Sequence, residues 1–312
     1  MDAAMVAQVR RFNRVVTQRV GALDERFLAR DRPLGAARVL WEIGADERDV
    51  RSLRAQLGLD SGYMSRLLRS LETAGMITVA ISESDRRVRT VWLTAAGLAE
   101  RAMLDRRSDS LASSLLAPLD PAQRARLVGA MAVVERLMTA GMVEISITDP
   151  VEPDAQHCLS AYVAELDSRF ATGFDPARSI SAVEDELRPP AGLFMLASLH
   201  GNPVGCGALK FHGNEPAELK RMWVDVSARG LGIGRRLLAL LEAQAAQRGV
   251  TLIRLETNES LVEAVALYRS AGYAEVAAFS ADPYAHHWFE KQIADHAVAR
   301  TAEGSDEGRP RR

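Results

Sequence analysis

The stretch ELKRMWVDVSARGLGIGRRLLALLEAQA at residues 218–245 decides the fold of the second half of the chain. Its beginning predicts a strand that ends near Asp225, and its end predicts a long amphipathic helix. The glycine-rich loop between them lets backbone N–H groups approach a diphosphate, and the helix N-terminus adds its positive dipole end. Because the loop has no Gly-Lys-Ser/Thr sequence and follows the fourth predicted strand of this half, it fits neither a Walker loop nor a Rossmann dinucleotide site.

Predicted strands and helices alternate on both sides of this loop, which indicates an α/β domain. The strand that starts at Val143 follows Gly141 almost directly, so no Pro/Gly/Ser tether separates this domain from the one before it. We expect domains at 1–141 and 142–292 and a disordered tail at 293–312, which is rich in Ala, Glu, Gly and Arg. The predicted strands cover residues 143–148, 193–199, 204–211, 217–225, 251–257, 273–280 and 284–290, and the predicted helices cover 153–170, 180–187, 233–248 and 260–270.

A second segment, LIRLETNESLVEAVALYRSAGYAEV at residues 252–276, carries further information. Together with the loop, it resembles the GNAT acetyltransferase family, whose acetyl-CoA pyrophosphate loop reads Arg/Gln-x-x-Gly-x-Gly/Ala. The resemblance covers about residues 143–291 and implies a mixed, mostly antiparallel sheet and acetyl-CoA as co-substrate. Because the sequence shows no metal-ligand spacing, we expect no metal. The cofactor contacts that it implies are Met222, Trp223, Val224, Arg229, Gly230, Leu231, Gly232, Ile233, Gly234, Arg235, Asn258 and Tyr268.

The resemblance also implies roles in acetyl transfer. Glu218 lies where many family members place a carboxylate base, and a carboxylate of ordinary pKa, about 4.3, would act through water or with a raised pKa. The Tyr268 phenol corresponds to a frequent general acid, the Val224 N–H would hold the acetyl carbonyl, and the Met222 backbone would pair with the pantetheine arm. The alternative readings are that Glu218 is an exposed strand carboxylate and that Tyr268 is a packing aromatic.

The acceptor site is less clearly marked in the sequence. The segment after the first helix of this domain and the final strands would form its walls. There Arg169 would hold a substrate carboxylate and Phe174 would line an apolar wall, whereas His286 either faces the pocket or is a structural histidine. We expect a small-molecule amine as the acceptor.

The first half of the chain predicts a helical domain with one short hairpin. Residues 1–142 hold 22 basic and 17 acidic side chains, a net charge of +5, whereas the rest has a net charge of −7, which suggests different partners for each half. A helix, a turn, a second helix and a hairpin with arginines at its tip form the winged helix-turn-helix arrangement. Residues 61–69 would then lie in the major groove of double-stranded DNA.

The recognition segment SGYMSRLLRSLETAGMI (61–77) and the wing ESDRRVRTVWLT (83–94) resemble the MarR family of transcription regulators. The family pattern Asp-x-Arg followed by Leu-Thr is present in the wing, and the resemblance covers about residues 1–140. It implies a homodimer through the helices predicted at 3–29 and 95–140, on half-sites about one helical turn (~34 Å) apart. The alternative is that the arginines of the recognition segment and the wing are only solvent-exposed side chains of a helix and a turn, without a role in DNA binding. The DNA-contacting residues implied are Ser61, Tyr63, Ser65, Arg66, Arg69, Arg86 and Arg87.

Composition excludes several classes of protein. Two cysteines cannot form a disulfide framework, which points to a reducing compartment. No stretch approaches the ~18 uncharged apolar residues that a membrane span needs, and we expect a cytoplasmic protein.

Taken together, the two resemblances predict a mainly-α winged helix-turn-helix domain followed by an α/β GNAT domain, which together form a bifunctional regulator and N-acetyltransferase. The alternative function is a regulator whose GNAT-like domain senses acetyl-CoA or another ligand without turnover.

Overall fold

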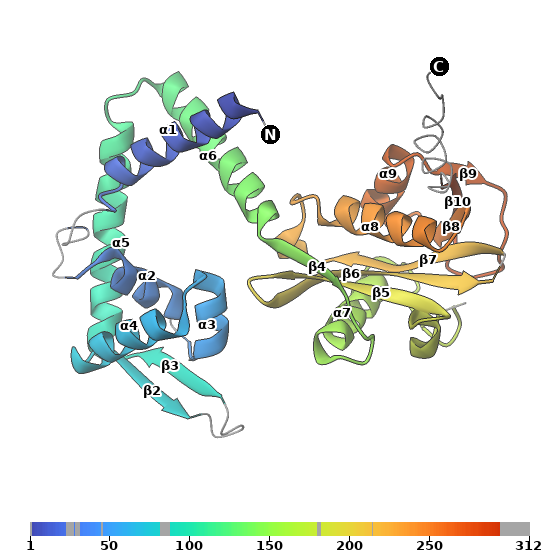
Figure 1. The fold of residues 1–312 in the computed structure, drawn as a ribbon, viewed down its shortest axis with the longest axis horizontal. Helices are drawn as coiled ribbons and strands as arrows, with labels where there is room; N and C mark the ends of the chain where they lie inside the picture. The colour runs from blue at the N-terminus through green and yellow to red at the C-terminus, as the bar shows by residue number, and fades with distance from the viewer. Residues whose placement is uncertain are drawn as a thin grey trace, which may run out of the picture. The chain divides into compact units, whose positions relative to one another are not determined.

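The computed structural model describes residues 2–22, 28, 32–44, 46–81, 88–179, 182–213 and 215–293. The chain divides into two compact units, Met1–Val134 and Glu135–Arg312 (Figure 1). Arg86, Arg87 and nearly all of the tail predicted at 293–312 lie outside the described residues.

The first unit is mainly helical, and its helices begin where the sequence offers a capping side chain. The Asp49 and Asp60 carboxylates accept hydrogen bonds from the first-turn N–H groups of the third and fourth helices, and the Thr94 hydroxyl caps the fifth. The first helix ends earlier than the predicted residue 29, and Gly21 follows it with a φ of 66°. The elements are α1 (Ala3–Arg19), α2 (Leu34–Ile43), β1 (Arg48–Asp49), α3 (Val50–Leu57), α4 (Ser61–Thr73), β2 (Ile77–Ile81), β3 (Arg89–Leu93), α5 (Ala95–Leu116) and α6 (Pro121–Gly141), whose last residues belong to the second unit.

Helices α2 and α4 and the sheet β1-β3-β2 enclose the core of this unit. Leu40, Leu53, Leu71 and Val91 are fully buried there, which is the pattern expected of amphipathic helices packed on a small antiparallel sheet. Helix, turn, helix and hairpin follow in the predicted order. The winged helix-turn-helix arrangement is therefore confirmed.

The second unit is built on a seven-stranded sheet in the order β4-β5-β6-β7-β8-β10-β9. All neighbouring strands are antiparallel except β7 and β8, so the predicted mixed, mostly antiparallel sheet is confirmed. Its elements are β4 (Val143–Ile147), α7 (Pro153–Arg169), η2 (Glu184–Leu187), β5 (Gly192–Leu199), β6 (Asn202–His212), β7 (Glu215–Val224), η3 (Val226–Ala228), α8 (Ile233–Gln247), β8 (Leu252–Thr257), α9 (Val262–Ser270), β9 (Ala274–Val276) and β10 (His287–Gln292).

Two cores lie on opposite faces of this sheet. Helices α8 and α9 cover one face, and Leu237, Leu241 and Phe289 are fully buried in that core (Figure 1). Helix α7 covers the other face, where Cys158 and Phe194 are fully buried. The last two strands are shorter than predicted, since the chain between 277 and 286 leaves the sheet.

Candidate active site

The central strands β7 and β8 pair over a short distance only. Residues 217 and 218 of β7 lie opposite residues 253 and 254 of β8, and the described residues make no further pair between these strands. The edge of β7 that faces β8 is therefore open from Leu219 to Val224. Because the Asp225 N–H donates to a carbonyl of β6 and successive N–H groups of a strand alternate in direction, the Val224 N–H points into this opening.

A β-bulge interrupts β7 at the same place. Cys206 of β6 lies opposite Trp223, and Ala208 lies opposite Lys220, so two steps along β6 match three along β7. Arg221, within this bulge, has a φ of 57°, in the left-handed region that only glycine adopts without cost. The extra residue bends β7 away from the regular ladder and holds the opening.

A cavity of about 450 Å³ extends from this opening to the glycine-rich loop. Gly230 and Gly232 adopt φ angles of 82° and 76°, which a larger residue would adopt only with strain. Gly232 is the N-cap of α8, so the first N–H groups of that helix have no partner within the helix and face the loop side. Of the predicted cofactor contacts, those that line this cavity are Met222, Trp223, Val224, Arg229, Gly230, Gly232, Ile233, Gly234, Arg235 and Tyr268; Leu231 and Asn258 are not among its lining residues.

The charge at the mouth of this cavity comes from a network around Glu165 on α7, which the sequence analysis did not single out. Both carboxylate oxygens accept from Arg229 Nη2 at 2.6 Å, and one also accepts from Arg169 Nη1 at 3.0 Å. Trp223 Nε1 donates to the same carboxylate at 2.9 Å. Partial burial acts to raise the pKa of Glu165, but these hydrogen bonds lower it overall, so Glu165 is ionised at neutral pH and orients Arg229.

Tyr268 lies where this cavity meets a second, smaller one. Its side chain is buried, lines both cavities and packs against Tyr273 and Phe289, so it has the packing contacts of a core residue and also borders the candidate site. Its role as a general acid stays a prediction. Burial raises the pKa of the Tyr268 phenol, with a smaller contribution from Tyr162. The phenol therefore keeps its proton at neutral pH and is a hydrogen-bond donor in an apolar setting.

The second cavity, of about 100 Å³, lies on the other side of Met222 and Tyr268; we call it the acceptor cavity. Phe170, Phe174 and Tyr284 form a cluster of rings on its wall, with centroids 4.9–5.8 Å apart. Phe174 thus lies where the sequence predicted an apolar wall. Asn258 also lines this cavity: its side chain donates to the Tyr284 carbonyl and accepts from the Ser260 N–H.

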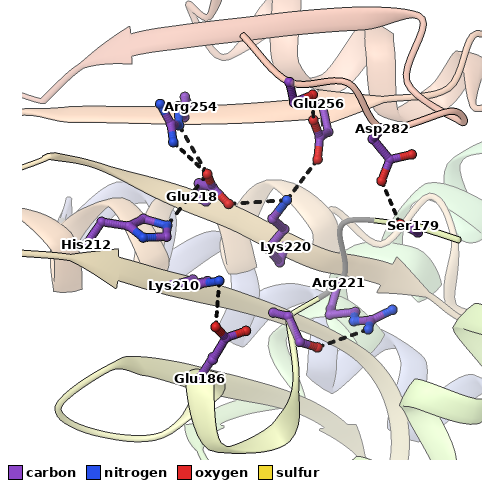
Figure 2. A network of polar contacts seen from close by, with 12 residues as sticks. Ser179, Glu186, Lys210, His212, Glu218, Lys220, Arg221, Arg254, Glu256 and Asp282 are labelled. Carbon is purple, nitrogen blue, oxygen red and sulfur yellow. Dashed lines mark hydrogen bonds and ion pairs between the residues drawn. The ribbon is translucent and has the colours of Figure 1, made fainter. Parts of the chain in front are cut away.

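Glu218 lies in a cluster of cations instead of in either cavity (Figure 2). Its carboxylate accepts from Arg254 Nη2 at 2.8 Å and lies 3.3 Å from Lys220 Nζ and 3.6 Å from His212 Nε2. Burial acts to raise the pKa of Glu218, but Lys220 and Arg254 lower it overall. Its role as a base stays a prediction, and these contacts make the carboxylate a weak base.

Two of the predicted acceptor residues lie elsewhere. Arg169 lines the larger cavity, where it pairs with Glu165 and with Glu263 at 2.7 Å. His286 precedes β10, is 44% exposed at its side chain, lines neither cavity and lies 3.6 Å from a Glu259 oxygen. The sequence placed both residues near the site but gave no sign of the direction of their side chains.

The first unit displays most of the predicted DNA-contacting side chains on one exposed face of α4. Ser61, Ser65, Arg66 and Arg69 are exposed, whereas Tyr63 is half-buried against the core and lies under the Arg66 guanidinium at 5.7 Å. The wing strands β2 and β3 are present, and the wing tip lies outside the described residues.

Within the described residues, no helix combines the length and apolarity that a membrane span requires. In the same part of the chain, no cluster of three or more His, Cys, Asp or Glu side chains is placed to hold a metal ion.

The open β7 edge, the glycine loop before α8 and the paired cavities define the class of the second unit, an acyl-CoA N-acyltransferase fold that follows a winged helix-turn-helix unit. A model of the Acetyltransferase (GNAT) family matches residues 160–273, and a model of the MarR family matches residues 31–88.

Individual proteins match the second unit. An IAA acetyltransferase of Azospirillum brasilense is 35% identical over 141 residues, which cover 45% of this chain and 90% of that one. A mycothiol acetyltransferase of Cellulomonas flavigena is 38% identical over 98 residues, 28% of each chain. The crystal structure of a GNAT-family acetyltransferase from Staphylococcus aureus covers 49% of this chain and 99% of its own, with 20% identity and a TM-score of 0.42. The chain belongs to the GNAT acetyltransferase family and carries a MarR-family domain ahead of the acetyltransferase domain.

Proposed function

We propose that the second unit transfers the acetyl group of acetyl-CoA to the amine of a small molecule, and that the first unit binds operator DNA in the cytoplasm as a homodimer. The observation that carries the enzymatic proposal is the opening between β7 and β8, where two cavities meet at Met222 and Tyr268. One cavity reaches the N-terminus of α8, where an anion would bind, and the other ends among aromatic rings and polar groups. A donor and an acceptor bound in these cavities would meet at the opening.

The larger cavity fits acetyl-CoA because its parts match the parts of that molecule. The N–H groups at the start of α8 and the Arg229 guanidinium would hold the diphosphate. The open backbone edge at Met222 would hydrogen-bond the pantetheine arm as an added strand. When bound, acetyl-CoA supplies an activated acetyl thioester.

The chain's own groups would then assist transfer at the opening. The Val224 N–H points toward the place where the acetyl oxygen would lie and would stabilise the negative charge that develops there. The Tyr268 phenol, protonated at neutral pH, would donate to the departing sulfur. Glu218 is the base that the resemblance implies, and its ion pairs favour a positioning role through Lys220 and Arg254.

The small acceptor cavity, about 100 Å³ in volume, favours a small-molecule amine over a folded protein surface. For the first unit, the exposed serine and arginine side chains of α4 support binding in a major groove. Helices α1 and α6 bury no residue within the described structure, and their exposed apolar side chains include Val9, Phe12, Met131 and Leu137. Such faces support a homodimer that covers them.

The test is to incubate the full-length protein with acetyl-CoA and a panel of small amines and to measure free thiol, with calorimetry of acetyl-CoA binding in parallel. We expect tight binding and amine-dependent thiol release. Binding without thiol release for any amine would refute the enzyme and favour the sensor. The absence of binding would refute both readings of this cavity.

A further inference from the structure

The acceptor cavity contains two cations that differ in their partners. Lys220 lies between two carboxylates, 3.3 Å from a Glu218 oxygen and 2.9 Å from a Glu256 oxygen. Among the residues that the structure describes, Arg221 has no carboxylate within ion-pair distance (Figure 2). Asp282 also lines this cavity, where its carboxylate accepts from the Ser179 hydroxyl and the Tyr284 N–H. Arg221 is therefore the cation of this cavity that makes no direct ion pair with an acidic side chain of the described residues.

The guanidinium of Arg221 is held in place by two contacts. Its Nη2 donates to the Ala182 carbonyl at 3.2 Å, and its central carbon lies 5.5 Å from the centre of the Tyr162 ring. The guanidinium also interacts with the Tyr162 hydroxyl; burial raises the pKa of this hydroxyl, and the guanidinium acts to lower it. Because a guanidinium has five N–H donors, these contacts leave donors available to a ligand. A partly buried cation that keeps unused donors in a cavity is suited to a bound anion, above all a planar carboxylate.

The bulge in β7 explains why this side chain enters the cavity. Leu219, Met222 and Val224 all pack toward the core under α8, although a regular strand would place residues 219 and 222 on opposite faces. The extra residue in the bulge removes this conflict and sends Arg221 to the α7 face, beside Tyr162. The left-handed φ of Arg221 is part of the same arrangement.

We propose that Arg221 binds the carboxylate of the acceptor, so that the substrate is an amino carboxylate with an apolar side chain. The ring cluster of Phe170, Phe174 and Tyr284 would contact that side chain. This inference rests on the proposed acetyltransferase function, and it assigns to Arg221 the carboxylate contact that was predicted for Arg169. In the reaction, the neutral amine nitrogen bonds to the acetyl carbon, the carbon–sulfur bond breaks, and the sulfur leaves as the thiol with the proton of the Tyr268 phenol. The proton that the amine loses restores the phenol, and the carboxylate is unchanged.

The experiment compares acids with their matched amides on the full-length protein. Thiol release is measured with acetyl-CoA and L-leucine, L-leucinamide, L-phenylalanine or L-phenylalaninamide, for the wild type and for Arg221→Gln. We expect Arg221→Gln to lower kcat/KM for the acids by about 10- to 100-fold and to change the amides by less than about threefold. The ratio of kcat/KM for each acid to kcat/KM for its amide is compared between the wild type and Arg221→Gln, which cancels the intrinsic difference in amine basicity.

A matched control keeps the result specific. Arg248 also lies 5.5 Å from an aromatic ring, that of Phe211, but it is exposed and lines neither cavity, so Arg248→Gln should leave both substrate classes unchanged. Acetyl-CoA affinity by calorimetry and the unfolding midpoint show whether Arg221→Gln is folded. If it is not, Arg221→Lys, which keeps the charge without the bidentate geometry, should lower the acid activity more than the amide activity.

The outcomes separate the two proposals. Equal losses for acids and amides, or an unchanged preference in Arg221→Gln, would overturn the carboxylate site while the enzyme stands. If no amine releases thiol, calorimetry of the same acids and amides on the CoA-loaded protein decides. If the acids bind more tightly than the amides and Arg221→Gln abolishes this difference, the carboxylate site is supported although the catalytic proposal has failed. Binding without that selectivity, or no binding, overturns the carboxylate site.

Discussion

Replacing Glu218 with glutamine distinguishes a catalytic base from a structural ion cluster. The side chain is 14% exposed, pairs with the cations Lys220 and Arg254, lies 3.6 Å from His212 Nε2 and lines neither cavity. Breaking a buried ion pair costs about 3–5 kcal/mol. Here Lys220 keeps Glu256 at 2.9 Å and Arg254 keeps the Phe279 ring at 4.8 Å, so we expect a loss of about 1–3 kcal/mol of unfolding free energy.

The same substitution should have little effect on acetyl transfer. A general base contributes about 10²–10⁴-fold, but Lys220 and Arg254 lower the pKa of Glu218 overall, although burial opposes them. We therefore expect kcat/KM to fall by less than about tenfold. Glu144→Gln, on an exposed strand glutamate of β4, is the matched control for both measurements.

The stability effect of Glu218→Gln should depend on pH with a defined sign. A carboxylate whose folded pKa is lowered contributes stability above its unfolded pKa, about 4.3, and loses that contribution as the pH falls through the lower folded value. Urea unfolding of both proteins from pH 7 to pH 3 should show a difference that shrinks below about pH 4. A fall in kcat/KM of about a hundredfold, with unfolding unchanged at pH 7, would refute this reasoning and restore Glu218 as the base.

Three further predictions test the cofactor, acid and DNA assignments. Arg229→Ala should weaken acetyl-CoA binding by about 5- to 30-fold in calorimetry, because the diphosphate loses a charged hydrogen-bond donor whose side chain is 35% exposed. Unchanged affinity would contradict the assignment. Tyr268→Phe should lower kcat by about 10²-fold or more with acetyl-CoA affinity unchanged, whereas Tyr273→Phe, which removes the hydroxyl of a neighbouring buried tyrosine, should not; equal effects would make Tyr268 a packing residue. Arg66→Ala should weaken DNA binding in a gel shift by about 1–3 kcal/mol, measured on duplexes that the wild type selects from a random library. Arg248→Ala is the control and should not change this binding. Equal binding by both variants would count against the α4 interface.

The sequence predicted most helices, the succession of strands along the second unit and the glycine loop, because local signals specify them. Asp49, Asp60 and Thr94 begin helices as capping side chains do, and the backbone angles of Gly230 and Gly232 follow from residue type. The loop residues therefore line the larger cavity almost as predicted. Such signals are short-range, and each is complete within a few residues of the chain.

The direction of the β7 side chains beside the acceptor cavity depends instead on where the bulge interrupts the pairing of β7 with β6. A single extra residue in a strand reverses which face each following side chain occupies, so regular alternation cannot predict it. Counting by twos from Leu219 would put Arg221 beside the core under α8, whereas the bulge puts it beside Tyr162. For the same reason, the sequence led us to assign the binding of the substrate carboxylate to Arg169, which forms ion pairs with Glu165 and Glu263. Arg221 makes no ion pair with a described carboxylate, so its guanidinium is available to a ligand, and that availability is a property of the assembled contacts and not of the residue type.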